Sequence, residues 1–579
     1  MAVPPAPIAD PQRIDLRAVQ QTLRGGKASD AWMATWLPAT YAAPDRFRVG
    51  LFAHAGARRG TPMKSEPKGA SDLYHDLVIA HLGKRRNAIV ERKDGSWERT
   101  SYDALHARCS ALTVAWAAAG VEAGTKVCAV LRPGLELAVA LLTAFRLGAV
   151  VSVLPPLGAA FVGHRLSLLE PDRVTTLERN RRLLGAHAAT MLPTTAPPRP
   201  APSAPHAYAA GEIALAVVTP FAHEMDDLVI EIEAGRVLDA AVRDGQLVHC
   251  LEPGEVLAAP GLDPLQFHPA LMLAALAAGA TWADLSEETL DEAPKALEEL
   301  GVTVLGVSRG FRERLLQKDA EPMRPTVRAW FRSLTETQEA TRWDVFGKAT
   351  AERRIPGFGV VADPAAPGIR LWGVPAASTP SLGVWPAAGV PWQLSEIAGG
   401  TVLALNDAGV HTIVRDEEPI DAPPRVVLGR FGNGWIYAGT VPLGPDAQAY
   451  PEAEVEALAQ RHPEVRHASA FVAAGRLLNE AKTVLLLFVE PPLSARADEP
   501  AAVDVAALKA TIAREMGDRY VPGRIEVFPL RPLVVDGVVD KSWCRGQYLS
   551  GMLSKKARSE TFRLLSRLGY VFAPPSSEG

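Results

Sequence analysis

The chain has 579 residues, of which 48% are hydrophobic and 22% charged, with a formal net charge of −4. This composition is that of a globular protein long enough for several domains, and it gives no argument for a nucleic-acid or membrane partner. No uncharged apolar run reaches the roughly 18 residues of a membrane span. The cysteines are scattered without metal-ligand spacing and the N-terminus lacks the apolar core of a signal peptide, so we expect no metal site and a cytoplasmic location.

The order of the predicted elements suggests three parts. Residues 1–70 show no clear pattern, and we assign them no fold. From residue 71 short apolar strands alternate with helical patterns, as in KVCAVLRP, LELAVALLTAFRLGAV and VVSVLPP (residues 126–156). This alternation is typical of βαβ units in a parallel sheet, and we expect it to continue to residue 438. Residues 439–579 read as helix, two strands and helix, which predicts a small α+β domain.

Four segments in this order resemble the adenylate-forming superfamily of acyl-CoA synthetases, luciferases and nonribosomal-peptide adenylation domains. They begin TSYDALHARC (residue 100), PLQFHPALM (residue 264), YPEAEVEAL (residue 450) and YVPGRIEVF (residue 520). The resemblance implies a large N-terminal α/β domain with parallel βαβ sheets and a small C-terminal α+β domain. It also implies a chemistry in which ATP activates a carboxylate as an acyl-adenylate, and a thiol, often that of coenzyme A, then displaces AMP.

The family's phosphate loop, TSGTTGxPKG, corresponds here to TPFAHEMDDL (residues 219–228). Its glycines, which let the backbone approach the phosphates, are replaced by Phe221, Glu224 and Leu228, and its lysine is replaced by Asp227. Each contact between a carboxylate and a phosphate at about 4 Å is unfavourable by roughly 1–4 kcal/mol in a partly solvated site. We therefore expect neither ATP nor magnesium to bind.

The family's YGmTE motif stacks the adenine on its aromatic ring and supplies a glutamate to magnesium. The nearest match is WGVPA, in which Trp372 and Gly373 retain the aromatic–glycine pair but Ala376 replaces the glutamate. The resemblance assigns Trp372 and Gly373 to substrate binding. The alternative is that Trp372 is a core residue at the end of a strand.

Two further family positions have lost their chemistry. The aspartate that holds the ribose corresponds to Val427, whose side chain cannot accept a hydrogen bond. The catalytic lysine corresponds to Val538, and Lys541 lies three residues further on. On an extended strand, a shift of three residues points a side chain to the opposite face, so we do not expect Lys541 to replace the missing lysine.

The family's acyl pocket corresponds to the segment around PLQFH, which makes Phe267 a candidate for substrate binding and His268 the candidate catalytic residue. A histidine beside an acyl group is able to act as general base for a thiol, amine or hydroxyl nucleophile. The alternative is a wall residue or a helix cap. Cys250 follows His249, but adjacent residues on a strand point in opposite directions, so a buried structural thiol is expected there instead of a catalytic dyad.

Three functions stay open. The first is ATP-independent acyl transfer from an acyl- or aryl-CoA thioester to a carrier-protein thiol or another acceptor, with no cofactor required. The second is an inactive binding or scaffold partner of an active enzyme, so whether the chain is an enzyme is undecided. The third, ranked last, is an ATP-dependent acyl-CoA ligase with a displaced nucleotide site.

Overall fold

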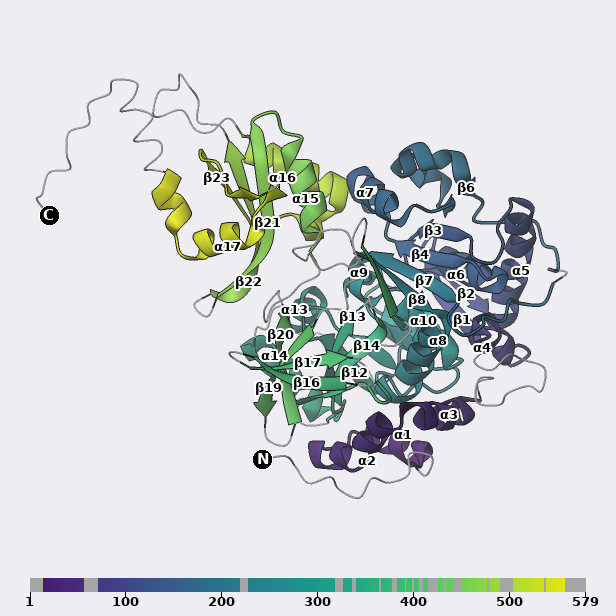
Figure 1. Ribbon diagram of the computed structural model, residues 1–579. Coiled ribbons are helices and arrows are strands. Elements are labelled where there is room, and N and C mark those ends of the chain that lie inside the picture. The colour runs from purple at the N-terminus through teal and green to yellow at the C-terminus, as the bar shows by residue number, and fades with distance from the viewer. Residues whose placement is uncertain are drawn as a thin grey trace, which may run out of the picture. The chain divides into compact units, whose positions relative to one another are not determined.

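The computed structural model groups the chain into two compact units (Figure 1). Unit 1 comprises residues 1–449 except 157–164 and 221–226, which group with residues 450–579 in unit 2. The structure describes residues 14–56, 71–201, 203–218, 228–317, 326–335, 340–363, 366–376, 383–390, 392–397, 400–405, 410–414, 425–431, 434–441, 450–475, 478–489, 503–535 and 538–557.

A 13-stranded sheet forms the centre of unit 1. Its strands from β13 to β1, in the order β13, β12, β11, β9, β10 and β1, all run parallel, and antiparallel strands extend the sheet on both sides. The sheet has the order β16 (Trp392–Ile397), β17 (Gly400–Leu405), β19 (Arg425–Phe431), β20 (Gly434–Val441), β15 (Gly383–Pro386), β14 (Ala366–Gly373), β13 (Gly357–Asp363), β12 (Ala329–Ser333), β11 (Val304–Gly306), β9 (Val256–Ala258), β10 (Thr281–Ala283), β1 (Asn87–Lys93) and β2 (Ser96–Ser101).

A second, seven-stranded sheet of unit 1 contains the strand–helix–strand pattern that the sequence predicts for residues 126–156. Here β3 and β4 pair in parallel, and helix α6 (Leu135–Leu147) connects them along the chain, so this prediction is confirmed. The order is β18 (Val410–Val414), β8 (Leu228–Glu233), β7 (Ile213–Val218), β4 (Val150–Leu154), β3 (Lys126–Val130), β5 (Arg173–Thr175) and β6 (Met191–Leu192).

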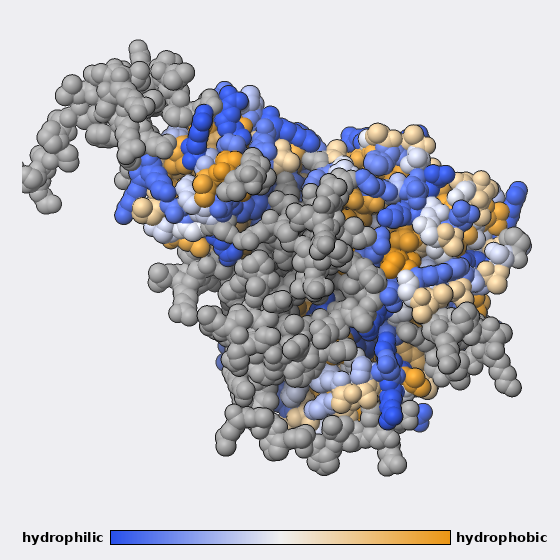
Figure 2. Space-filling model, in the orientation of Figure 1, coloured by the Kyte–Doolittle hydropathy of each residue, from blue (hydrophilic) through white to orange (hydrophobic). Residues whose placement is uncertain are grey.

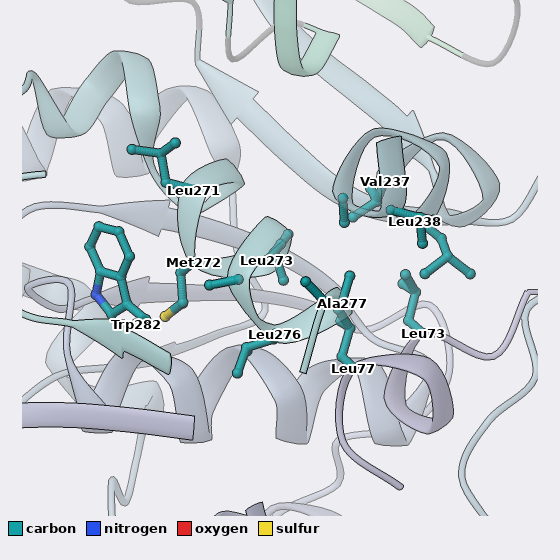
Figure 3. Close-up of a cluster of buried hydrophobic side chains, with 14 of the residues drawn as sticks. Leu73, Leu77, Val237, Leu238, Leu271, Met272, Leu273, Leu276, Ala277 and Trp282 are labelled. Carbon is teal, nitrogen blue, oxygen red and sulfur yellow. The ribbon is translucent and has the colours of Figure 1, made fainter. Parts of the chain in front are cut away.

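The two faces of the larger sheet bury two separate clusters of apolar side chains. Successive residues of its parallel strands alternate between the clusters, as the period of a strand requires. Ile89, Leu257, Trp282 and Phe331 belong to the larger cluster, and Val90, Ala258, Ala283 and Trp330 to the smaller one. Figure 3 shows part of the larger cluster, where α10 (Ala270–Ala277) places Leu271, Met272 and Leu276 near Trp282 of β10.

The helices between residues 71 and 352 complete the large α/β unit, except that residues 159–164, the first part of α7, group with unit 2. Helices α5, α6, α8 and α10 supply much of the larger cluster. The helices besides α6 and α10 are α4 (Leu73–Leu77), η3 (Ile79–His81), α5 (Tyr102–Ala118), α7 (Ala159–Leu169), η4 (Glu178–Thr190), α8 (Ala234–Arg243), η5 (Asp244–Val248), α9 (Pro264–Phe267), α11 (Glu287–Glu292), α12 (Ala296–Glu299), α13 (Arg309–Gln317) and α14 (Ala340–Glu352). None of the helices formed by the described residues is both long and apolar enough to cross a membrane.

Three N-terminal helices form a layer on unit 1 in a region to which the sequence assigned no fold (purple in Figure 1). They are α1 (Leu16–Arg24), α2 (Asp30–Ala42) and α3 (Pro44–Ala55). Their large buried apolar side chains belong to the larger apolar cluster. Polar contacts add to this packing, since Asp30 accepts a hydrogen bond from Trp385 Nε1 (3.0 Å) and Tyr41 donates one to the carbonyl of Pro386 (2.7 Å).

Unit 2 is a small α+β domain, as predicted. Its three-stranded sheet, in the order β21 (Val465–Gly475), β22 (Leu478–Val489) and β23 (Arg524–Phe528), is accompanied by helices α15 (Glu452–Gln460), α16 (Val505–Met516), η6 (Asp518–Tyr520) and α17 (Lys541–Leu549) and by the hairpin β24 (Val534–Val535) and β25 (Val538–Val539). Figure 2 shows hydrophilic side chains over most of its visible surface, with small apolar areas between them.

Candidate functional site

Helix α9, which carries Phe267, lies at the carboxyl ends of the parallel strands. The side chain of Gln266 donates from Nε2 to the carbonyl of Ala362, near the end of β13 (2.9 Å). Its Oε1 accepts from Oγ1 of Thr335, two residues beyond the end of β12 (3.0 Å). Since ligands of open α/β sheets bind outside the carboxyl ends of their strands, α9 and His268, which follows it directly, are placed where a substrate site is expected.

Local sequence explains why α9 starts and stops where it does. Asp263 caps its first turn by accepting a hydrogen bond from the backbone of Leu265 (2.9 Å), and Pro264 occupies the first helical position. The backbone becomes extended at His268, which ends the helix. Phe267 is buried in the larger apolar cluster.

His268 is half-buried and packs against Trp282 of β10, with ring centroids 5.2 Å apart and ring planes at 80°. Its Nδ1 is buried without a hydrogen-bond partner, whereas Nε2, which also has no partner among the described residues, retains contact with solvent. Burial lowers the pKa of His268 to about 4. The ring is therefore neutral at pH 7, and it is a weaker base than the candidate role of general base would favour.

Trp372 lies in β14 and is fully buried, with Nε1 unpartnered. Its strand is antiparallel to β13, so the chain from Trp372 onward leads to the amino end of β13, where Ala376 bridges to Gly357 and to Lys27 of the N-terminal layer. A Cβ atom on Gly373 would lie only 3.2 Å from the backbone nitrogen of Gly359, so close strand packing explains this glycine. The structure does not bring Trp372 and Gly373 to the edge where His268 lies.

A second aromatic–glycine pair, Phe358 and Gly359, lies on β13 itself and was missed in the sequence. It follows strand β12 and helix α14 in a βαβ unit, and its strand runs toward the carboxyl edge. That strand–helix–strand order is the signal that could have found it. Read against YGmTE, the glutamate position becomes Ala362, which is buried. In both registers an alanine therefore stands where the family has its magnesium ligand.

In unit 2, the ammonium group of Lys541 is already paired. Its Nζ lies 3.4 Å from Oε2 of Glu456 and 3.7 Å from Oε2 of Glu452, both on α15. Val538 pairs with Val535 in the hairpin that precedes Lys541.

In unit 1, Val427 lies in β19, opposite Gly439 of β20. Strand β20 continues past residue 439, where the sequence predicts the domain boundary. Of the acidic phosphate-loop segment, residues 219–227 lie outside the described residues.

Cys250 and His249 form no catalytic dyad. Both side chains are buried, and the Cys250 thiol donates to the carbonyl of Leu247 (3.1 Å). Burial raises the pKa of Cys250 to about 12 and lowers that of His249 to about 3, while the His249 ring packs against Phe331 at a centroid distance of 4.7 Å. The expected buried thiol is confirmed.

No cluster of three or more metal-ligating side chains occurs in the described parts of the chain.

A carboxyl pair that the sequence did not reveal lies where β10 ends. Asp284 follows β10, and Glu91 of β1 accepts a hydrogen bond at Oε2 from the backbone of Leu135, the first residue of α6 (3.0 Å). A Cβ atom on Gly134 would lie 3.0 Å from an oxygen of each carboxyl group. Burial, and secondarily the charge of Glu91, raises the pKa of Asp284 to about 7. At pH 7 the Asp284 carboxyl group is therefore only about half ionised.

No protein-family model and no curated protein sequence matches the chain. Solved structures do resemble it. Acetoacetyl-CoA synthetase from Streptomyces lividans aligns with a TM-score of 0.60 at 15% identity, over 93% of this chain and 94% of that one. NpsA-ThdA, an artificially fused adenylation–PCP di-domain NRPS from Klebsiella oxytoca, aligns with a TM-score of 0.59 at 14% identity, over 79% and 86%.

A third similar structure is a double mutant of o-succinylbenzoate CoA synthetase from Bacillus subtilis, bound with its product analogue OSB-NCoA. It aligns with a TM-score of 0.56 at 12% identity, over 81% of this chain and 97% of that one. Likeness at such low identity establishes the fold, and it agrees with the two units and their sheets described above. The chain therefore has the fold of the adenylate-forming superfamily, to which acyl-CoA synthetases and peptide-synthetase adenylation domains belong.

Proposed function

We propose that this chain is a non-adenylating relative of acyl- and aryl-CoA ligases. It takes an acyl group from a pre-activated thioester and passes it to a carrier-protein thiol or another acceptor, without ATP or magnesium. A thioester is already activated, so the reaction needs no triphosphate. The kind of substrate is supported by two of the similar proteins, one bound with a coenzyme A product analogue and the other fused to a PCP.

The observation that carries the proposal is the pairing of Lys541. This lysine is the nearest in sequence to the family's catalytic lysine, yet its ammonium group lies against Glu452 and Glu456 of α15. A cation engaged by two carboxylates is a poor partner for the phosphate and carboxylate groups of an adenylation step. The alanine at the magnesium-ligand position in either register, Ala362 or Ala376, supports the same conclusion.

The acyl site of this proposal lies at the carboxyl edge of the large sheet. His268 faces the acyl carbonyl, Phe267 contributes to the wall, and Trp372 and Gly373 support the strands behind it. Helix α9 fixes the first two residues relative to β12 and β13 through the hydrogen bonds of Gln266.

A binding partner without turnover is the second candidate, and the state of the thiols favours it. Cys109, Cys128 and Cys250 are buried, and burial raises the pKa of each thiol above its ordinary value. A buried thiol with a raised pKa holds little thiolate at neutral pH, so these cysteines offer no nucleophile for a covalent acyl intermediate. Transfer would then have to occur directly between the thioester and the acceptor.

A thermal-shift titration separates the candidate functions. The full chain is titrated with ATP and magnesium, then with acetyl-CoA and benzoyl-CoA, with free coenzyme A as the control. We expect the acyl-CoA thioesters to raise the melting temperature and ATP with magnesium to leave it unchanged. Stabilisation by ATP, followed by conversion of a free acid to its adenylate, would refute the proposal.

Intact-mass measurement then separates transfer from binding. A phosphopantetheinylated carrier protein is incubated with benzoyl-CoA in the presence and absence of the chain. An acyl mass added only in its presence supports transfer. Stable thioester binding without any added mass identifies the binding partner.

A further inference from the structure

We propose that His268 binds the carbonyl oxygen of the thioester as a neutral hydrogen-bond donor, through Nε2–H, and that Gln266 is the residue that positions it. This inference rests on the proposed function, because it assigns a role within the same acyl site. It replaces the role of general base that the sequence suggests for His268.

The surroundings of the two ring nitrogens determine which one carries the proton. Nδ1 of His268 is buried and has no acceptor within hydrogen-bond distance. A buried N–H group without an acceptor is rarer in proteins than a buried acceptor without a donor. The proton therefore belongs on Nε2, which retains contact with solvent and has no partner among the described residues. The ring presents a donor at the carboxyl edge of the sheet.

The neutral state of the ring fits a donor better than a base. Burial lowers the pKa of His268 to about 4, so the imidazole gains little by accepting a proton at pH 7. A hydrogen bond to a developing negative charge is strengthened in a site of low dielectric, and it requires no change in the protonation of the ring. Trp282 packs against the ring and restricts its rotation, with ring centroids 5.2 Å apart.

Gln266 fixes the helix that ends at His268. Its carboxamide donates to the carbonyl of Ala362 (2.9 Å) and accepts from Thr335 (3.0 Å), so it ties α9 to β13 and to the segment after β12. Oγ1 of Thr335 also lies 2.7 Å from Oγ of Ser333. Since α9 spans only four residues, these bonds determine where His268 stands relative to the edge of the sheet.

The chemistry of the step balances without a proton transfer to His268. The acceptor thiol loses its proton to solvent, and its sulfur attacks the thioester carbonyl carbon, forming a C–S bond. The π electrons of the C=O bond move to the oxygen, where Nε2–H of His268 stabilises the charge. When the intermediate collapses, the C=O bond forms again, the C–S bond to coenzyme A breaks, and the leaving thiolate takes a proton from solvent.

Two substitutions separate a donor from a base. His268→Gln keeps an N–H donor near the position of Nε2 but has no basic nitrogen, whereas His268→Phe keeps only the ring. We measure the infrared band of benzoyl-CoA labelled with ¹³C at the thioester carbonyl, free and bound to each protein, together with its Kd and the rate of transfer to the carrier protein.

In the wild type and in His268→Gln we expect the carbonyl band to shift to lower frequency on binding. In His268→Phe we expect the shift to disappear and the transfer rate to fall by roughly 10²-fold, while Kd changes much less. Two results would overturn the inference. One is a bound carbonyl band at the same frequency in all three proteins. The other is a His268→Gln variant that keeps the carbonyl shift but is as inactive as His268→Phe, which is the result expected if His268 acts as a base.

The role of Gln266 is tested by the same band. Gln266→Met removes both hydrogen bonds at similar volume, and we expect a weaker and broader carbonyl shift. Gln246→Met, at a buried glutamine in η5, is the matched control and should leave the band unchanged. A positioning role is refuted if both variants give the wild-type band. If benzoyl-CoA and acetyl-CoA do not bind the wild type at all, the proposed function fails together with this inference, whereas binding without a carbonyl shift refutes the inference alone.

Discussion

Nζ of Lys541 lies 3.4 Å from Oε2 of Glu456, so the first residue of α17 is held against helix α15. Glu452 lies on the other side of the ammonium group at 3.7 Å. A cation at the amino end of a helix opposes the helix dipole, and here two carboxylates offset that effect. Since all three side chains are largely buried, we interpret Lys541 as a structural residue of unit 2 and not as a replacement for the family's catalytic lysine.

The first prediction concerns the substitution Lys541→Met. It removes the ammonium group that lies against Glu452 and Glu456, and we expect it to lower the free energy of unfolding by about 3 kcal/mol. Thioester binding should remain unchanged. Urea denaturation of the full chain, followed by the benzoyl-CoA titration, checks both. Lys541→Arg is the control that keeps the charge, and unchanged stability with lost transfer activity would contradict the structural role.

The second prediction concerns Glu255, which joins the N-terminal layer to the large sheet. Its carboxylate lies 2.9 Å from Nη1 of Arg24 in α1 and 2.7 Å from Nε of Arg328, which precedes β12. Replacing it by glutamine removes the carboxylate that Arg24 and Arg328 share, and Arg24 then keeps only the more exposed Glu252 as an ion-pair partner (3.3 Å). We expect Glu255→Gln to lower the free energy of unfolding at pH 7 by about 3 kcal/mol. Glu252→Gln, at a more exposed partner of Arg24, should change it by less than about 1 kcal/mol.

The effect of Glu255 should also depend on pH. Although burial opposes it, hydrogen bonds from Arg328 and Arg24 lower the pKa of Glu255 to about 2, below the ordinary 4.5. The unfolded chain therefore binds this proton first as the pH falls. The stabilising contribution is complete above about pH 4.5 and disappears as the pH approaches 2. The difference between wild type and Glu255→Gln, followed by denaturation between pH 7 and pH 3, should shrink over that range, and a constant difference would contradict the ion-pair account.

The third prediction concerns Asp284, whose contribution to stability should decrease as the pH rises, the reverse of the pH dependence of Glu255. Its pKa is raised from 3.8 to about 7, so the folded chain keeps this proton where the unfolded chain loses it. The contribution of Asp284 to stability is present below about pH 4 and is lost as the pH rises to 7. Asp284→Asn should therefore be more stable than the wild type at pH 8, by on the order of 3 kcal/mol, and this advantage should vanish near pH 4.

Denaturation at pH 4, 6 and 8 checks this expectation. Glu122→Gln, at an exposed carboxylate, serves as the control and should show no such trend. If Asp284→Asn is less stable than the wild type at pH 8, the carboxyl group is ionised and stabilised by a partner, and the raised pKa of Asp284 is refuted.

The sequence revealed those features that depend on contiguous segments. The strand–helix rhythm of residues 126–156 is a local pattern, so α6 could be anticipated, whereas the segment PLQFH was identified by its resemblance to the family and not as the helix α9. The pair Glu91 and Asp284 could not, because its members meet only through the parallel pairing of β1 and β10.

The N-terminal layer was missed for a different reason. Helix α2 contains Pro38 in its interior, which is typical of a helix break, although Met33, Trp36 and Leu37 are buried at helical spacing. The aromatic–glycine motif also has two candidates, Trp372–Gly373 and Phe358–Gly359, and strand direction alone shows which one runs toward the carboxyl edge. The residues of the motif do not determine the direction of the strand that carries it.

The fourth prediction tests whether the N-terminal layer is part of the folded unit. Gly389 has a φ of +73°, and a Cβ atom there would lie 2.7 Å from the ring of Phe47 in α3. Its backbone nitrogen also donates to Thr40 of α2 (3.1 Å). Gly389→Ala should therefore add a clash with α3 to the usual penalty of a left-handed alanine, a total of about 2–4 kcal/mol. Gly254→Ala is the matched control, because Gly254 has a φ of +90° but open space around its Cβ position.

Hydrogen exchange followed by mass spectrometry distinguishes the two effects. In Gly389→Ala we expect the amides of α2 and α3 to exchange faster, because the helices must shift to accommodate the methyl group. In Gly254→Ala we expect an increase confined to its own turn, with the exchange of α2 and α3 unchanged. Equal exchange of α3 in both variants would mean that Phe47 does not pack against Gly389 in solution, and that the layer does not contribute to the core of unit 1.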